Sequence, residues 1–563
     1  MDKESEFIKN MFEKGVLVNK DLLEKKIDPS IIDKIEQESD LIVLNNDYVD
    51  VINQQTSLID WYEVDIYRVE AEKERDDSIY QSHLQTFKQS TLMLNTPSFS
   101  QEQNINSLES DFDENSNFLL TIETSLDEEL PADLLTVSLE EKLDSKEIEI
   151  VTSFKNVPKK YVVKDFTQIF LSRYRFLEGL LRNRKELENT MAINRLLSKK
   201  EKDNVALIGL VEDISETQKG NLILTLEDPT GKIKVLVTKT NKNLYGFAKE
   251  LVVDEVVGIS GISGDKIIFA DAIIWPDIPS NNELKKSDKE EYMIFLSDIH
   301  VGSNLFMKEE FEKFLKWLNG ELGNEKQREI AKNIKYIAIA GDLVDGIGIY
   351  PSQLEELKIK DIILQYQEFN NLIKQIPSNK QIIICPGNHD AVHLAEPQSA
   401  FDKSFSPTLF DLPNVTLVTN PAMVNVGKTK TFPGFNVLLY HGSSFDYYVA
   451  HVESIRNNGG YHRADLIMKF LLKRRHLAPS FKSTPYFPGH KEDPLLIKKI
   501  PDFFVSGHIH YSNISNYKGI TTICGSCWQE KTSFQEKMGH EPEPARVPIV
   551  NLKTREVKIL KFK

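Results

Sequence analysis

The stretch YMIFLSDIHVG, residues Tyr292–Gly302, decides how the second half of the chain folds. The apolar run from Met293 to Leu296 predicts a short buried strand. The loop that follows carries Asp298 and His300, two residues apart. Open α/β sheets bind their ligands beyond the carboxyl ends of the strands, so this carboxylate and this imidazole are candidates for a binding site. Taken alone, the pair is weak evidence, because loops are rich in aspartate.

Four further segments repeat this design of an apolar run, a loop and an Asp, Asn or His beside a glycine. They are YIAIAGDLVDG (336–346), IIICPGNHD (382–390), VLLYHG (437–442) and FFVSGHIH (503–510). Carboxylates, amides and imidazoles all bind divalent metal ions. Five such segments in one chain predict a metal site that folding assembles from distant positions.

The length and composition limit the class of protein. A chain of 563 residues is long enough for two to four domains. No run of apolar residues is long enough to cross a membrane, and the charged start MDKESEFIKN differs from a signal peptide. Three cysteines, Cys385, Cys524 and Cys527, are too few for a disulfide framework, and the CxxC pair is interpreted as structural. We therefore expect a cytoplasmic protein.

The net charge of −16 argues against a chain that coats itself in nucleic acid without specificity. Much of that charge is concentrated in one segment, since residues 109–149 contain fourteen Asp and Glu but only two Lys. A nucleic-acid substrate stays compatible with the composition, because metal ions can neutralise a phosphate locally.

The patterns along the chain predict a multidomain α+β protein. We expect a small helical N-terminal module at 1–65, a disordered acidic low-complexity linker at 66–160, a connecting helix within 161–200, an OB-type β-barrel at 201–280 and an α/β domain at 290–563. The N-terminal module is interpreted as a packing or protein-binding unit. The linker is too polar to bury a core, although its apolar patches leave open short docking motifs for a partner.

The predicted barrel rests on five runs of alternating or β-branched residues between 204 and 277, separated by turn signals such as Asp228–Gly231. Five short strands in so short a segment are typical of an OB-type barrel. Such barrels often bind single-stranded nucleic acid through aromatic side chains and basic grooves. Because this one has few aromatic residues in its strands, a structural or partner-binding role is equally open.

The mixture of ligand-type residues fits a site with two metal ions. Two divalent ions about 3.5–4 Å apart accelerate phosphodiester hydrolysis, because they acidify a water molecule and stabilise the attacking and leaving oxygens. Two ions need more ligands than one motif supplies, including a carboxylate that bridges them. Imidazoles combined with Asp and Asn oxygens favour Mn²⁺, with Mg²⁺, Fe and Zn as alternatives.

The spacing DxH…GDxxD…GNHD…HG…GHxH resembles that of the calcineurin-like metallophosphoesterase superfamily. This resemblance implies a calcineurin-like α/β sandwich for residues 290–563. The implied ligands of one metal ion are Asp298, His300 and His510, and those of the other are Asn388, His441 and His508, with Asp342 bridging the two. His389 would be the general acid that protonates the leaving oxygen. Asp345 and Asp390 are expected to orient imidazoles or loops from outside the ligand set.

Other stretches, such as LEDPTGKIKVLV (226–237), FLSDIHVGSNLF (295–306) and LLKRRHLAPSF (471–481), and the domain order resemble the small-subunit family of archaeal family-D DNA polymerases. That family implies a metal-dependent 3′→5′ exonuclease that proofreads single-stranded or mismatched 3′ ends. It also implies a heterodimer, or a larger assembly, with a large catalytic polymerase subunit. Direct binding to a sliding clamp is left open.

Three alternatives stay open at this point. The chain could be a non-catalytic assembly subunit, like the related eukaryotic B subunits with degraded metal ligands, a metallophosphatase or a recombination nuclease of the same superfamily. All eight positions of the pattern are filled here, however, and buried His and Asp without partners would only destabilise a scaffold. The sequence therefore favours an active enzyme.

The basic stretch KFLLKRR (469–475) follows a predicted helix. One interpretation is a solvated helix end, which is common. The other is a surface that contacts DNA phosphates or a partner protein, for which Lys473, Arg474 and Arg475 are the candidate residues.

Overall fold

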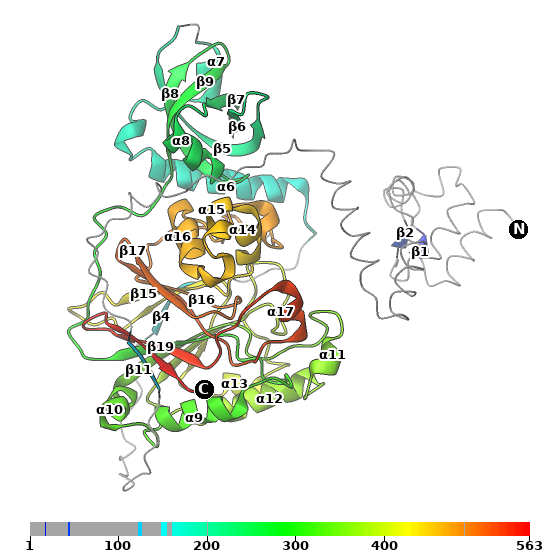
Figure 1. Cartoon of the computed structure of the whole chain (residues 1–563), viewed down its shortest axis with the longest axis vertical. Coiled ribbons are helices and arrows are strands. Elements are labelled where there is room, and N and C mark those ends of the chain that lie inside the picture. Colours follow the sequence, from blue (N-terminus) through cyan, green and yellow to red (C-terminus); the bar gives the residue numbers. More distant parts are fainter. Residues whose placement is uncertain are drawn as a thin grey trace, which may run out of the picture. The chain divides into compact units, whose positions relative to one another are not determined.

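The structure is a computed structural model that describes residues 148–154, 160–199, 201–488 and 490–563, with the backbone of three short strands at 17–18, 43–44 and 122–125. The chain separates into two compact units, residues 1–115 and 116–563, and the elements discussed below belong to the second (Figure 1). The helical module predicted at 1–65 and most of the linker predicted at 66–160 lie outside the described residues. The predicted domain boundaries stay predictions.

Two β-sheets form the larger part of the second unit (Figure 1). The first sheet has the order β13-β12-β11-β10-β19-β20-β3 and the second has the order β17-β18-β16-β15-β14-β4. The strands of the first sheet are β3 (Ile122–Ser125), β10 (Tyr292–Leu296), β11 (Ile334–Ala340), β12 (Gln381–Cys385), β13 (Val415–Leu417), β19 (Arg546–Asn551) and β20 (Val557–Lys561). Those of the second are β4 (Ile148–Thr152), β14 (Ala422–Val426), β15 (Phe435–Leu439), β16 (Phe503–Ser506), β17 (Asn513–Tyr517) and β18 (Ile520–Cys524).

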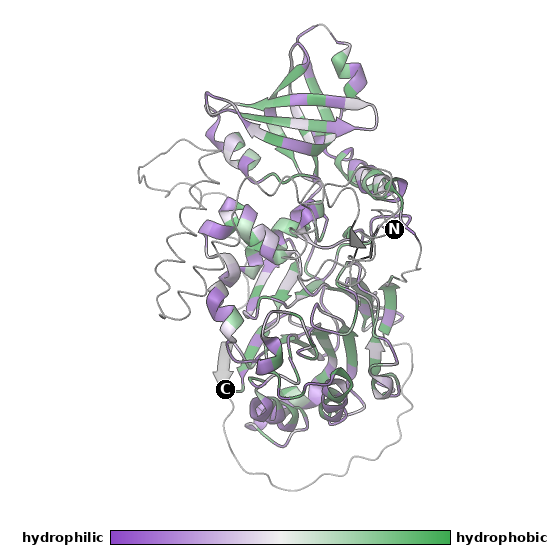
Figure 2. Cartoon of the chain, turned by 90° about the vertical axis from the view of Figure 1, so that its right-hand side faces the viewer, coloured by the Kyte–Doolittle hydropathy of each residue, from purple (hydrophilic) through white to green (hydrophobic). Residues whose placement is uncertain are grey.

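Strand β10 shows why the predicted strands read as unbroken apolar runs. Ile294 and Leu296 pack on one side of the first sheet with the helices that cover it. Met293 and Phe295 point the other way, into a core shared with the second sheet, where Phe295 contacts Phe503. A strand buried on both faces needs apolar residues at every position. Figure 2 accordingly shows the strands of the sheets mostly in green.

Helices cover the outer face of each sheet. Those packed on the first sheet are α9 (Lys308–Leu318), α10 (Glu325–Asn333) and α12 (Ile362–Ile373). Those packed on the second are α14 (Phe445–His451), α15 (Glu453–Asn457) and α16 (Ala464–Arg474). Shorter helices are α11 (Gln353–Glu356), α13 (Pro407–Phe410) and α17 (Ser533–Met538). The result is a layered α/β arrangement with two sheets in the middle.

The five strands expected between 204 and 277 are present and form a closed barrel with the order β5-β6-β7-β9-β8. They are β5 (Asn204–Glu216), β6 (Leu222–Asp228), β7 (Gly231–Val237), β8 (Val256–Ser263) and β9 (Ile267–Ile274). The helix α8 (Lys242–Lys249) lies between β7 and β8 in the chain, and its first turn is capped by the side chain of Asn241, which accepts from the backbone N–H of Leu244.

The predicted connecting helix is α6 (Val163–Leu181), which is followed by the short helix α7 (Ile193–Leu197). Tyr174 of α6 donates to the carbonyl of Ile208 in the barrel, over 3.1 Å. On the α/β side, the guanidinium of the buried Arg173 donates from Nε to Asp493 Oδ2 over 2.7 Å and from Nη1 to the carbonyl of Pro479. One helix therefore ties the barrel to the layered part of the unit.

Strand β4 corrects one sequence prediction. Residues 148–152 belong to the range predicted as a disordered linker, yet they pair antiparallel with β14 at the edge of the second sheet. Ile148 packs against the core between the sheets and Val151 against the core beneath α14–α16. The acidic composition concealed these apolar side chains, and β3, which pairs parallel with β20 of the first sheet, falls in the same predicted range.

No helix among the described residues is both long enough and apolar enough to span a lipid bilayer.

Candidate metal centre

The five ligand-bearing loops meet at one edge of the two sheets. Strands β10, β11 and β12 are neighbours and run parallel, as do β15 and β16 in the facing sheet. Their carboxyl ends therefore lie together, and each is followed by one of the predicted motifs. The sequence prediction of a site assembled from distant loops agrees with this arrangement.

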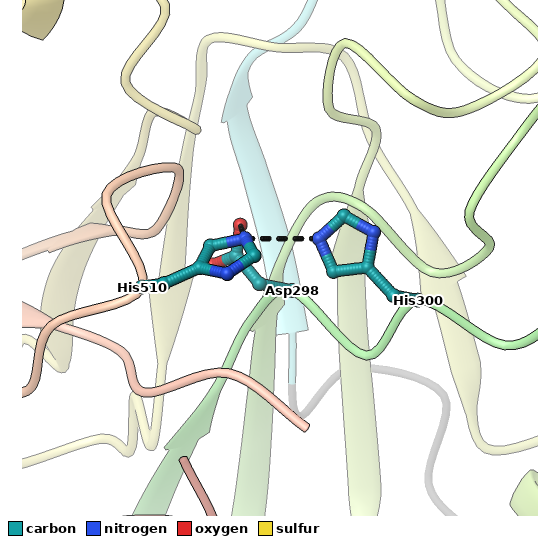
Figure 3. Close-up of side chains that lie close together, drawn as sticks. All are labelled: Asp298, His300 and His510. Atoms are coloured by element: carbon teal, nitrogen blue, oxygen red, sulfur yellow. Dashed lines mark hydrogen bonds and ion pairs between the residues drawn. The ribbon is translucent and has the colours of Figure 1, made fainter. Parts of the chain in front are cut away.

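Asp298, His300 and His510 form the first group, in which one donor atom from each residue lies within 4.8 Å of the others. The Nε2 atoms of His300 and His510 are 3.0 Å apart, and His510 Nε2 is 3.4 Å from Asp298 Oδ1 (Figure 3). All three side chains are buried. His300 places its other nitrogen, Nδ1, 3.1 Å from Asp345 Oδ1, so this carboxylate can take the Nδ1–H and leave Nε2 as a lone-pair donor.

Asn388, His441 and His508 form the second group. The amide oxygen of Asn388 lies 2.9 Å from His441 Nε2 and 2.9 Å from His508 Nδ1. Each imidazole uses its other nitrogen as a donor, His441 to the carbonyl of Ala340 and His508 to Asp446 Oδ2. When both imidazoles are neutral, three acceptor atoms face one another, and a cation among them removes the repulsion. The chemistry of these residues therefore fits a metal ion.

Asp342 lies between the two groups. Its Oδ2 is 3.3 Å from His441 Nε2 and 3.8 Å from His300 Nε2. Burial opposes ionisation of Asp342, but the neighbouring charges of His441 and His389 outweigh it and hold the pKa of the carboxyl well below its usual range. Burial likewise lowers the pKa of His441, yet Asp342 raises it to about 10. The carboxylates of this cluster thus favour positive charge beside them.

The backbone of this site is strained. Five of the implied ligands have a positive φ, namely Asp298 (52°), His300 (55°), Asp342 (53°), His508 (72°) and His510 (55°). A residue other than glycine in this left-handed region costs roughly 1–2 kcal/mol of conformational energy. Such strain persists where the surrounding fold enforces it, and it is concentrated at functional sites.

Two glycines make room for the carboxylates. A Cβ on Gly387 would collide with Asp342 Oδ1, and a Cβ on Gly507 would collide with Asp298 Oδ2. These are the glycines of the GNHD and GHIH motifs, so the motif glycines are explained by close approach to the implied ligands.

His389, the implied general acid, lies beside both groups. One of its ring nitrogens is within 4.8 Å of donor atoms on His300 and Asp342, and its backbone N–H donates to Asp342 Oδ1 over 2.9 Å. Its Nδ1 lies 2.7 Å from the carbonyl of Asp345, which can only accept, so Nδ1 carries a hydrogen and Nε2 is the nitrogen that can exchange a proton. Burial lowers the pKa of His389.

Asp345 and Asp390 occupy supporting positions. Asp345 accepts from the side-chain amide of Gln529 over 2.8 Å as well as facing His300. Asp390 accepts from the backbone N–H of Gly387 over 2.9 Å and from the hydroxyl of Tyr366 over 3.1 Å. These carboxylates connect the ligand loops to one another.

The sequence did not single out several side chains that hold the imidazoles. Asp446 contacts His508 Nε2, and Gln535 places Nε2 2.8 Å from His510 Nδ1. Gln353 donates to Asp345 over 2.9 Å. Asp446 follows His441 after only four residues, in HGSSFD, and this proximity could have marked Asp446 as a residue of the site. No sequence pattern marks Gln353 or Gln535 in the same way.

Lys473, Arg474 and Arg475 do not form the surface that the sequence suggested. Arg474 is 2% exposed and Arg475 is 3% exposed. Arg474 pairs with the buried Glu255 of the barrel, Nε to Oε2 2.8 Å, and Arg475 Nε donates to the carbonyl of Ile497. The Lys473 ammonium lies 3.9 Å from the centre of the Trp275 ring. The prediction of a DNA or partner contact is therefore wrong for the two arginines, which join the barrel and the α/β layers internally.

The fold and the site together define a mixed α/β protein with a small closed barrel and a buried candidate metal centre. Residues 293–513, which contain that centre, match the family model of the B subunits of DNA polymerases alpha and epsilon. The chain belongs to the family of archaeal DNA polymerase II small subunits, the small subunits of family-D polymerases. It is 37% identical over 389 residues to the "DNA polymerase II small subunit" of Methanothermobacter thermautotrophicus, covering 69% of this chain and 78% of that protein.

Two further relatives with the same description support this membership. The Archaeoglobus fulgidus protein is 39% identical over 387 residues, covering 69% of this chain and 75% of the relative. The Methanocaldococcus jannaschii protein is 39% identical over 394 residues, covering 69% of this chain and 64% of the relative. A solved structure of asparaginyl-tRNA synthetase from Pyrococcus horikoshii is similar over 15% of this chain and 21% of its own, with 18% identity and a TM-score of 0.14, and this likeness supports no conclusion.

Proposed function

We propose that this chain is a metal-dependent 3′→5′ exonuclease that removes unpaired or mismatched 3′ ends while a large catalytic subunit carries out DNA synthesis. The observation that supports this most directly is the convergence of eight candidate residues, from five separate loops, on one largely buried cluster. A scaffold gains nothing from such a cluster, because buried charges and strained backbone both destabilise it.

The folds of both parts support the proposal. Two facing sheets with helices outside, and ligand loops at the carboxyl ends of the central strands, favour a calcineurin-like phosphoesterase domain. In the barrel, the order β5-β6-β7-β9-β8 and the parallel pairing of its third and fifth strands, β7 with β9, favour an OB-type barrel.

The residues that would hold two divalent ions are Asp298, His300, His510 for one and Asn388, His441, His508 for the other, with Asp342 between them. Mn²⁺ suits this mixture of imidazole and oxygen ligands. When bound, such ions acidify a water molecule and stabilise negative charge on the phosphate. The protein contributes by fixing the ligand orientations, through Asp345 on His300 and Asp446 on His508.

His389 would complete the reaction as the acid. A proofreading step must leave a 3′-hydroxyl that the polymerase can extend. The oxygen of water therefore bonds to phosphorus while the bond from phosphorus to the O3′ of the penultimate nucleotide breaks, and the electron pair of that bond stays on O3′. His389 Nε2 supplies the proton that makes O3′ a hydroxyl, and the proton released by the attacking water passes to solvent, from which His389 is protonated again. The products are a nucleoside 5′-monophosphate and a strand shortened by one nucleotide. Burial makes a protonated His389 a stronger acid than an imidazole in water.

Replacing His389 with Ala tests this assignment. We expect the rate of single-strand degradation with Mn²⁺ to fall by about 10²–10⁴-fold, the usual contribution of a general acid. The matched control is His451→Ala, because His451 is an exposed histidine on α14 outside both ligand groups. Degradation by H389A at the wild-type rate would show that the acid is a different group.

Co-purification with the large subunit, followed by a primer assay, tests the wider proposal. We expect removal of a mismatched 3′ nucleotide to be faster than removal of a paired one, because unpairing the mismatch requires less free energy. Wild-type protein that assembles with the large subunit and degrades neither end in Mn²⁺ would support a purely architectural role.

A further inference from the structure

An aromatic pair lies beside the candidate metal centre, with Phe534 exposed and Tyr350 half-buried. Tyr350, in the loop that follows Asp345, and Phe534, in α17, stack with ring centroids 5.2 Å apart and an interplanar angle of 22°. Phe534 is 41% exposed, and Ile347 and Leu354 beside Tyr350 in the chain are also exposed. Apolar side chains gathered on a rim, instead of in a core, indicate a contact surface.

The pair is fixed in place by one carboxylate. The Tyr350 hydroxyl donates to Glu356 Oε2 over 2.9 Å, and the hydroxyl of Ser533, the neighbour of Phe534, donates to Glu356 Oε1. The loop and α17 are therefore joined at the point where the rings stack. A rigid stacked pair loses little conformational entropy when a planar ligand binds, so it is suited to that task.

The same pair is linked to the pocket on two sides. The Tyr350 ring centroid lies 6.4 Å from that of His389. From α17, Gln535 contacts His510 at 2.8 Å. The nearest part of a bound strand is then the nucleotide whose O3′ receives the proton of His389, which is the penultimate nucleotide of the substrate.

We propose that Phe534, supported by Tyr350, stacks on the base of the penultimate nucleotide of a single-stranded 3′ end. The assignment rests on the proposed exonuclease function and adds the group that positions the strand. Stacking on an aromatic ring accepts all four bases, since every base has a π-face. It also favours unpaired ends, because the face of a base within a duplex is already covered by its neighbours. The aromatic pair thus accounts for an exonuclease that accepts any sequence and prefers frayed ends.

The test combines a binding measurement with a kinetic one on the full chain. An oligonucleotide with 2-aminopurine at the penultimate position loses fluorescence when that base stacks, and this readout needs no catalysis. In Mn²⁺, kcat/KM is compared for a normal oligonucleotide and for one with an abasic penultimate residue. For the wild type we expect quenching on binding and about a 10-fold preference for the base-bearing strand, the usual contribution of one stacked base.

Phe534→Leu keeps an apolar side chain and removes the aromatic ring. We expect this variant to lose the quenching and to bring the ratio of the two kcat/KM values close to one, whereas Phe534→Trp should restore both. The control is Phe410→Leu on α13, because Phe410 is also 41% exposed but has no ring contact with Tyr350 or His389.

The stacking proposal is overturned if F534L keeps the wild-type quenching and the wild-type ratio, or if the wild type itself shows neither. Failure of the proposed function gives a different result. If the wild type quenches the fluorescence but hydrolyses neither oligonucleotide, the stacking of Phe534 on the base stands and the exonuclease function is refuted. Loss of the ratio in F410L as well would show that the effect is not specific to Phe534, and the proposal would fall.

Discussion

Arg474 offers a strong test of how the barrel is joined to the α/β layers. Its guanidinium is buried, pairs with Glu255 of the barrel at 2.8 Å, and lies 3.2 Å from the centre of the Phe470 ring. The change to examine is Arg474→Met, which keeps the apolar stem and removes the charge. Glu255 would then be a buried carboxylate without its ion-pair partner, with only the more distant charge of Lys473 acting on it.

The expected loss of stability in R474M depends on the hydrogen bonds that Glu255 keeps. Breaking a buried ion pair by removing one partner destabilises a protein by about 3–5 kcal/mol. Glu255 still accepts from the backbone N–H of Val252 over 2.7 Å and from Trp275 Nε1 over 2.9 Å. These two hydrogen bonds place the expected loss near the lower end, at about 3 kcal/mol of the free energy of unfolding.

The loss should also depend on pH. Burial raises the pKa of Glu255 even while Arg474 opposes the increase, so R474M raises it further. A carboxyl with a raised pKa in the folded state stabilises the protein below its unfolded pKa and loses that contribution as pH rises through the folded value. R474M should therefore be close to wild type near pH 4 and most destabilised above pH 7.

Urea unfolding, followed by circular dichroism and tryptophan fluorescence, measures these differences. In the double variant R474M/E255Q the loss should be smaller than the sum of the two single losses by about 2 kcal/mol, because each single change leaves the other charge unpaired. A cost below about 1 kcal/mol for R474M at pH 8, combined with weaker DNA binding, would refute the internal role of Arg474 and restore the surface contact that the sequence suggested.

Three further outcomes are expected. Burial and Arg173 lower the pKa of His476 to about 4, so at acid pH the unfolded chain takes up a proton at this residue that the folded chain excludes. The free energy of unfolding should therefore fall by about 3 kcal/mol between pH 6.5 and pH 4. His476→Gln should remove this pH dependence in urea titrations at several pH values, and a full pH dependence in that variant would contradict the reasoning. Mn²⁺ at 100 times its Kd should stabilise the wild type by about 2.7 kcal/mol in thermal unfolding. Asp342→Asn should abolish this stabilisation by Mn²⁺, and asparagine tolerates the left-handed backbone of this position. An equal stabilisation of D342N would exclude Asp342 as a ligand. Gly387→Ala should leave the circular dichroism spectrum unchanged but reduce Mn²⁺ affinity by at least 10-fold in calorimetric titration. The reason is that the added Cβ displaces the carboxylate of Asp342. Unchanged affinity would count against the tight packing of this loop.

The strands and ligand loops were predictable because their signals are local. An apolar run that ends in a loop with Asp298 and His300 identifies a buried strand and a ligand in one short window. Arg474 shows the limit of such local signals. A basic helix end looks the same in sequence whether solvent or a buried carboxylate faces it, and Glu255, which decides the matter, lies more than 200 residues earlier in the chain.

The contacts that orient the imidazoles were hidden for a similar reason. Gln535 and Gln529 reach the site only because α17 and the loop before it pack against the loops that follow β16 and β11, and a lone glutamine carries no signal of that placement. The aromatic pair of Tyr350 and Phe534 combines residues far apart in sequence that the rim of the pocket brings together. Tertiary packing decides these positions, so no local pattern could reveal them.

Strand β4 has a practical consequence for anyone shortening this protein. Its residues hydrogen-bond to β14 and form the outermost strand of the second sheet, which carries the charged Glu149, whereas β14 behind it is mostly apolar and fully buried. A fragment that starts at Lys160 would keep the barrel and the candidate metal centre, but it would expose a row of unpaired backbone N–H and C=O groups. Such a border recruits strands from other molecules. Fragments that include Ile148–Thr152 should therefore remain monodisperse where shorter ones aggregate.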